Sequence, residues 1–122
     1  SLLSKCYQFF VMKLYKNLLN SFNGFKEGLK EHSFILEILG GLFLIPYLVV
    51  SSMDNLFKLI IVLVYFMLLA LELLNTAIEK LSDKITKKFD PEIKKVKDLS
   101  SSSVFVILIL LLILLTISLL EI

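Results

Sequence analysis

Three long apolar stretches run through this sequence, and they restrict the chain to one class of fold. The hydrophobic share of the chain is 57%, above the ~45–50% that is usual for soluble domains. A helix needs about 20 mainly apolar residues to cross the hydrocarbon core of a bilayer. The sequence therefore predicts an all-α integral membrane protein with three transmembrane helices, at residues 33–50, 56–78 and 104–120.

The basic residues are unevenly distributed, and their positions predict how the spans are oriented. All 13 are lysines: five precede the first span, seven lie between the second and third, and only Lys58 lies elsewhere. Basic segments remain on the cytoplasmic side of a membrane, so we expect the N-terminus and a loop at residues 80–98 to face the cytoplasm. The second helix is expected to run past its span to about Thr86 or Lys88. Pro91 then predicts a break, because proline disfavours helix at the preceding residue. The chain as a whole, residues 1–122, is interpreted as one multi-pass domain.

The segment before the first span, residues 1–30, has the composition of an amphipathic surface helix. Apolar residues such as Phe9 and Leu18 recur along it among lysines and asparagines such as Lys13 and Asn17. Helices of this kind lie in the plane of the membrane interface, with their apolar face among the headgroups. An amphipathic helix on a soluble face of the protein is the open alternative.

The second span carries polar side chains that a membrane helix rarely contains. Steps of three, four and four residues place four of them on one helical face: Glu72, Asn75, Glu79 and Asp83. Ionisable groups inside a membrane are costly and generally mark function. Solvation outside the hydrocarbon is the alternative for Asp83. Glu37 lies inside the first span, where a structural contact with a neighbouring helix is the alternative.

Carboxylates close to lysine-rich segments favour a magnesium ion and a phosphorylated ligand. Mg²⁺ is often held by one or two carboxylates together with phosphate oxygens, and lysine supplies further charge for phosphates. Glu79 lies roughly 10 Å nearer the cytoplasm than Glu72 on a helix that rises 1.5 Å per residue, so a metal–nucleotide would reach Glu79 first. Glu72 lies nearer the lipid, where a carboxylate is suited to proton transfer. The basic loop lacks interleaved aromatic residues, so no nucleic acid partner is expected.

The polar stripe also matches a known family. The segment "ELLNTAIEKLSD", residues 72–83, resembles the E-x-x-N-[ST]-A-I-E-x-x-x-D signature of the small prokaryotic diacylglycerol kinases and the related undecaprenol kinases. The segment "EHSFILE", residues 31–37, resembles the family's E-x-x-F-x-x-E segment, and Lys97-Asp98 falls at its K-D position before the third span. The resemblance covers nearly the whole chain, including the surface helix and the three spans.

The resemblance implies a homotrimer in the bacterial cytoplasmic (inner) membrane, with active sites shared between subunits. Such a protein transfers the γ-phosphoryl group of MgATP to the hydroxyl of a membrane lipid, here diacylglycerol. By resemblance, Glu72 is the catalytic proton acceptor, and Glu31 and Glu79 are the metal ligands. The nucleotide-binding residues that it implies are Lys13, Asn75, Glu79, Lys88, Phe89, Asp90, Lys97 and Asp98. The substrate-binding residues that it implies are Ser21, Glu37, Glu72 and Ser101.

Two other functions remain open on the sequence. The same chemistry on undecaprenol fits equally well, because both lipids offer a primary hydroxyl beside apolar tails. A small non-enzymatic transporter or proton-coupled channel, with Glu72 as its intramembrane carboxylate, is the weaker alternative. That alternative accounts for one buried acid but not for two acids and an amide on one helical face.

Overall fold

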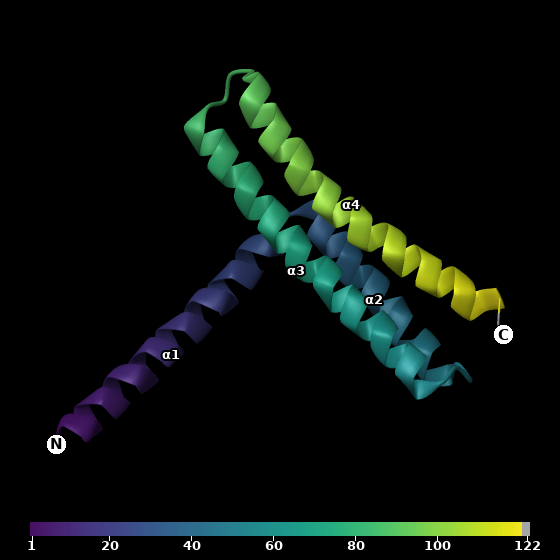
Figure 1. Ribbon diagram of the computed structural model, residues 1–122, viewed down its shortest axis with the longest axis horizontal. Helices are drawn as coiled ribbons and strands as arrows, with labels where there is room; N and C mark the ends of the chain where they lie inside the picture. Colours follow the sequence, from purple (N-terminus) through teal and green to yellow (C-terminus); the bar gives the residue numbers. More distant parts are fainter. Residues whose placement is uncertain (121–122) are drawn as a thin grey trace.

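The computed structural model describes residues 1–120, and these residues form four helices. They are α1 (Leu2–Gly28), α2 (His32–Val50), α3 (Asn55–Ile85) and α4 (Pro91–Leu120). In Figure 1, α3 and α4 form a long antiparallel hairpin, and α2 lies along α3. Helix α1 extends away from the other three, so that it resembles an arm attached to a three-helix bundle (Figure 1).

Three of these helices, α2, α3 and α4, are long and apolar enough to cross a membrane. This result confirms the all-helical class and the three expected apolar helices. Helix α2 begins one residue before the expected span at 33–50 and ends with it, whereas α3 and α4 extend beyond the spans expected at 56–78 and 104–120. Hydropathy marks the part of a helix that is suited to lipid, and polar turns continue both helices past that part.

The segment at residues 80–98, expected to be a cytoplasmic loop, is mostly helical: α3 continues to Ile85, close to the expected end of the second helix, and α4 begins at Pro91. Only residues 86–90 lie outside helices between α3 and α4. Proline suits the first turn of a helix, where its missing N–H would have no partner, and Pro91 occupies that position. The Asp90 carboxylate accepts hydrogen bonds from two backbone N–H groups of the first turn, at 2.9 and 3.2 Å, as an N-cap residue does. The expected break is therefore the start of α4.

The apolar core lies mainly between α3 and α4, with a contribution from α2. Its buried members are Leu48, Ile61, Val64, Leu68, Ile107 and Leu111. Polar contacts also hold α2 against its neighbours. The Tyr65 hydroxyl of α3 donates to the backbone carbonyl of Glu37 at 2.9 Å, and its ring occupies the space that a side chain at Gly41 would fill. The hydroxyls of Tyr47 in α2 and Ser118 in α4 lie 2.8 Å apart.

Helix α1 contacts the other helices at its C-terminal end. Gly28 is buried there against Leu73 of α3 and Phe34 of α2. Many large apolar side chains nearer the N-terminus, such as Phe9 and Phe10, are exposed. The location of α1 on a membrane surface stays a prediction, and so does the homotrimer.

Candidate active site

Three of the acidic side chains predicted from the sequence, Glu31, Glu72 and Glu79, line one pocket at the junction of α2, α3 and α4. The pocket has a volume of about 370 Å³, and we call it the acidic pocket. Its polar lining comes from the start of α2, the middle of α3 and one residue of α4, while its apolar wall comes from α4. The lining residues are Glu31, Ser33, Glu72, Asn75, Thr76, Glu79, Ser101, Val104, Phe105 and Leu108.

Glu72 is the most buried acid of this pocket, with only 5% of its surface exposed. Its Oε1 atom accepts a hydrogen bond of 2.7 Å from the hydroxyl of Ser33 in α2. Glu37, one turn after Ser33 on α2, lies against the Glu72 carboxyl. Its own Oε2 atom is buried and has no hydrogen-bond partner. Glu72 is therefore held between two polar side chains of α2.

Asn75 and Glu79 form a second polar pair one turn further along α3. The Asn75 Nδ2 atom donates to Glu79 Oε1 at 3.3 Å, which orients the exposed Glu79 carboxylate. The Oδ1 atom of Asn75 is buried without a partner. Buried polar atoms are nearly always paired, so this oxygen has the capacity to accept a donor or to face a cation.

The donor set of the pocket fits a divalent metal that arrives with its own ligands. Within residues 1–120, no three His, Cys, Asp or Glu side chains are arranged to hold a metal ion by themselves. Mg²⁺ usually needs only one or two carboxylates when phosphates and waters complete its shell. Glu31 and Glu79 provide two carboxylates on the same pocket. These two residues would hold the metal. The unpaired Asn75 oxygen carries a partial negative charge, which also favours a cation in this pocket.

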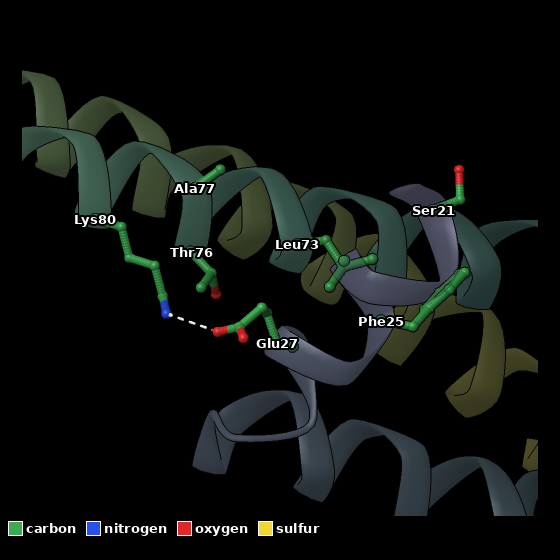
Figure 2. Close-up of a pocket in the computed structure, with 9 residues that line it drawn as sticks. Ser21, Phe25, Glu27, Leu73, Thr76, Ala77 and Lys80 are labelled. Carbon is green, nitrogen blue, oxygen red and sulfur yellow. Dashed lines mark ion pairs between the residues drawn. The ribbon is translucent and has the colours of Figure 1, made fainter. Parts of the chain in front are cut away.

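A second pocket lies between the end of α1 and α3, and we call it the α1–α3 groove (Figure 2). Its volume is about 400 Å³. The side chains of Phe25, Leu73 and Ala77 give it an apolar wall, and Ser21 lies at one end. Thr76 lines both this groove and the acidic pocket, so the two cavities lie on either side of one side chain.

An ion-pair network spans the α1–α3 groove. Figure 2 shows Lys80 of α3 reaching Glu27 of α1, with 3.6 Å between Nζ and Oε2. The same ammonium lies 3.7 Å from Glu31 Oε1. Lys30 donates to Glu27 at 2.8 Å, and this hydrogen bond, with the charges of Lys30 and Lys80, holds the pKa of Glu27 below its ordinary value. Lys80 therefore connects α1 to one of the candidate metal ligands.

A third pocket, which we call the basic pocket, lies at the turn between α3 and α4. It has a volume of about 410 Å³ and is lined by Asp83, Thr86, Lys87, Lys88, Phe89, Asp90, Ile93, Lys94 and Lys97. Two of its lysines are paired. Lys97 donates to Asp83 at 2.5 Å across the hairpin, and Lys94 donates to Asp98 at 2.6 Å within α4.

The structure distributes the predicted site residues among these three cavities. The acidic pocket contains Glu31, Glu72, Asn75, Glu79 and Ser101, the basic pocket contains Lys88, Phe89, Asp90 and Lys97, and the groove contains Ser21.

Three predicted residues lie apart from these cavities. Glu37 lies beside Glu72 but outside the lining of the acidic pocket, and Asp98 is paired on the exposed face of α4. Lys13 belongs to the N-terminal half of α1, which extends away from the bundle (Figure 1).

Sequence reasoning missed Ser33, Glu27 and Lys80. One signal was present for Ser33, because residues four apart share a helical face and Ser33 precedes Glu37 by four. For Glu27 and Lys80 no comparable signal exists, since their contact depends on how α1 crosses α3.

The fold and this pocket define a multi-pass helical membrane protein with an acidic site where three helices meet. A family model described as prokaryotic diacylglycerol kinase matches residues 19–119. The chain therefore belongs to the prokaryotic diacylglycerol kinase family, and it is a lipid kinase, for which ATP and a divalent metal are implied. A comparison with curated proteins found no match.

Proposed function

We propose that this chain is a diacylglycerol kinase that uses MgATP to form phosphatidic acid in the bacterial cytoplasmic membrane, with its N-terminus in the cytoplasm. One observation supports this most: Glu31, Glu72 and Glu79 line a single pocket between helices that are apolar enough to lie in lipid. A lipid hydroxyl can reach such a pocket sideways from the bilayer. Membership of a kinase family favours this activity over a transporter or channel.

In the proposed reaction, the lipid hydroxyl oxygen attacks the γ-phosphorus of ATP in line, the bond to the bridging oxygen breaks, and ADP leaves. Glu72 accepts the proton of the attacking hydroxyl. Glu31 and Glu79 would hold the metal ion, which would supply positive charge to neutralise the phosphates. Asn75 holds Glu79 in place through its amide. The remaining contribution is positioning, which accounts for a large share of catalysis in phosphoryl transfer.

The two substrates are assigned to different groups of residues. The nucleotide is assigned to Lys88, Phe89, Asp90 and Lys97 of the basic pocket. The lipid is assigned to Ser21 of the α1–α3 groove, Ser101 of the acidic pocket and Glu37, which lies beside Glu72. Lys13 and Asp98 lie outside these cavities within one chain. In the homotrimer with shared sites that we propose, these two residues and the basic pocket serve the acidic pocket of a neighbouring subunit.

The test of the catalytic assignment is the substitution Glu72→Gln, which keeps the size of the side chain and the acceptor for Ser33 but removes the proton-accepting group. We expect turnover to fall by at least roughly 100-fold, the usual contribution of a general base, with the helical content unchanged. Lipid phosphorylation from labelled ATP in detergent micelles measures it. Glu92→Gln, at an exposed carboxylate paired with Lys95, is the matched control. A Glu72→Gln protein with near wild-type turnover would refute the assignment.

The acceptor is tested by offering the purified protein diacylglycerol and undecaprenol separately, each with labelled ATP and Mg²⁺. We expect label to enter phosphatidic acid at a much higher rate than it enters undecaprenyl phosphate. Faster labelling of undecaprenol would overturn the proposed acceptor and leave the kinase mechanism intact. Labelling of neither lipid would overturn the proposed reaction.

A further inference from the structure

We propose that Ser33 is a positioning residue for Glu72: its hydroxyl fixes the carboxylate of the candidate base toward the acidic pocket. The inference rests on the proposed function. It concerns a residue of the first turn of α2 that acts through Glu72 rather than on either substrate.

The contact between Ser33 and Glu72 joins α2 to α3 at the acidic pocket. The residues are 39 positions apart, and the distance from Ser33 Oγ to Glu72 Oε1 is 2.7 Å. Bonds from a hydroxyl to a carboxylate are short and roughly twice as strong as neutral ones. Among the residues that the structure describes, Ser33 is the side chain that donates a hydrogen bond to Glu72.

The position of Ser33 determines the direction in which the carboxylate turns. Ser33 and Glu37 are four residues apart on α2, and both lie against Glu72. Ser33 lines the acidic pocket, whereas Glu37 lies beyond its lining. A serine hydroxyl carries a proton that it can donate to a carboxylate. The donor thus lies on the pocket side and draws Glu72 Oε1 toward the cavity.

The orientation matters because the last torsion of a glutamate side chain has a broad preference. Glu72 is almost fully buried, so an unpaired carboxylate would turn toward whatever donor it could reach. A base that is rotated away from the pocket would lose its alignment with the lipid hydroxyl while both substrates still bound. The Ser33 hydroxyl removes this freedom at little structural cost, since Ser33 itself is exposed.

The first test is the substitution Ser33→Ala, with Ser33→Thr as the variant that keeps the hydroxyl. We expect kcat to fall by roughly 10-fold in Ser33→Ala, from the usual effect of removing a hydrogen bond to a charged group. The KM values for ATP and lipid should not change, and Ser33→Thr should recover most of kcat. Ser102→Ala is the matched control, because the Ser102 hydroxyl bonds to a carbonyl of its own helix.

The second test observes the contact without turnover. The infrared band of the Glu72 carboxyl, assigned by its loss in Glu72→Gln, should shift in Ser33→Ala and return in Ser33→Thr. An unchanged band, or a wild-type kcat in an active Ser33→Ala protein, overturns the role of Ser33. If the wild-type protein phosphorylates neither lipid, the proposed function and the catalytic role of Ser33 both fail, whereas the band still decides whether the contact exists.

Discussion

At the scale of single residues, polar side chains inside the apolar helices are paired across helix boundaries. The Glu72 carboxylate bonds to Ser33, the Tyr65 hydroxyl to the carbonyl of Glu37, and the Tyr47 hydroxyl to Ser118. An unpaired polar group in hydrocarbon is expensive, so each pair helps to define how the helices are rotated relative to one another. The unpaired Asn75 oxygen lies at the candidate site.

The metal assignment is tested at Glu79. Glu79→Gln keeps an oxygen that accepts from Asn75 but removes the negative charge that a cation needs. We expect the Mg²⁺ concentration for half-maximal ATP binding to rise roughly 10-fold or more, as substitutions at metal sites generally do. Titration of ATP binding with Mg²⁺ measures it, and Glu92→Gln serves as the control. An unchanged Mg²⁺ requirement would remove Glu79 from the metal site.

A second residue-scale prediction concerns the two adjacent glycines of α2. A methyl group at Gly41 would overlap the ring and hydroxyl of Tyr65, whereas one at Gly40 meets nothing within 4 Å in the chain. We expect Gly41→Ala to destabilise the fold by about 1–3 kcal/mol through overpacking. Gly40→Ala should have no such effect, because alanine favours helix. Unfolding in detergent micelles compares them, and equal stabilities would contradict the close approach of Tyr65.

At the scale of elements, the three apolar helices were predictable because each span is a predominantly apolar stretch close to the length that a bilayer requires. The start of α4 at Pro91, before the expected span at 104–120, was not predictable, because hydropathy gives no information about helix outside lipid. That part is supported by the Asp90 cap and by pairs such as Lys94–Asp98. Likewise, Glu72, Asn75 and Glu79 could be placed together from spacing on one helix. The partners from α1 and α2 could not, since they depend on how two helices cross.

The attachment of α1 to α3 gives a prediction at this scale. Glu27→Lys places a third positive charge beside those of Lys80 and Lys30, so the end of α1 should separate from α3. The double variant Glu27→Lys with Lys80→Glu should restore the contact, because the pair is reversed rather than lost. Amide hydrogen exchange at residues 24–28 measures it. Equal exchange in all three proteins would show that packing at Gly28, not charge, holds α1.

The same ion pairs make the attachment dependent on pH. Because the pKa of Glu27 is below its ordinary value in the folded chain, its charge stabilises the attachment above the ordinary carboxyl range. That contribution is lost as the pH falls through the lowered pKa. Exchange at residues 24–28 should therefore increase, relative to α3, as the solution becomes acidic.

At the scale of the whole molecule, α3 contributes lining residues to all three cavities, from Glu72 in the acidic pocket and Leu73 in the groove to Thr86 in the basic pocket. Within one chain the acidic and basic pockets have no lining residue in common. A homotrimer with shared sites predicts that one subunit supplies Glu72 and another supplies Lys97. Mixed trimers test this arrangement directly.

We expect that Glu72→Gln and Lys97→Ala chains, each inactive alone, regain activity when they are denatured, mixed and reassembled. In an equal mixture roughly a quarter of the shared sites would combine both intact residues. Activity of the mixed protein, compared with each variant treated alone, measures it. A mixture as inactive as its components would assign both residues to one subunit and contradict shared sites.

Thr76 is the partition between the compartment that faces α1 and the compartment that holds the acids. A bulkier side chain at this position would narrow both compartments, and a smaller one would join them. A change at Thr76 that alters which lipid is accommodated should therefore also alter how the phosphate donor is held. The lipid preference and the binding of the phosphate donor are thus coupled through this residue.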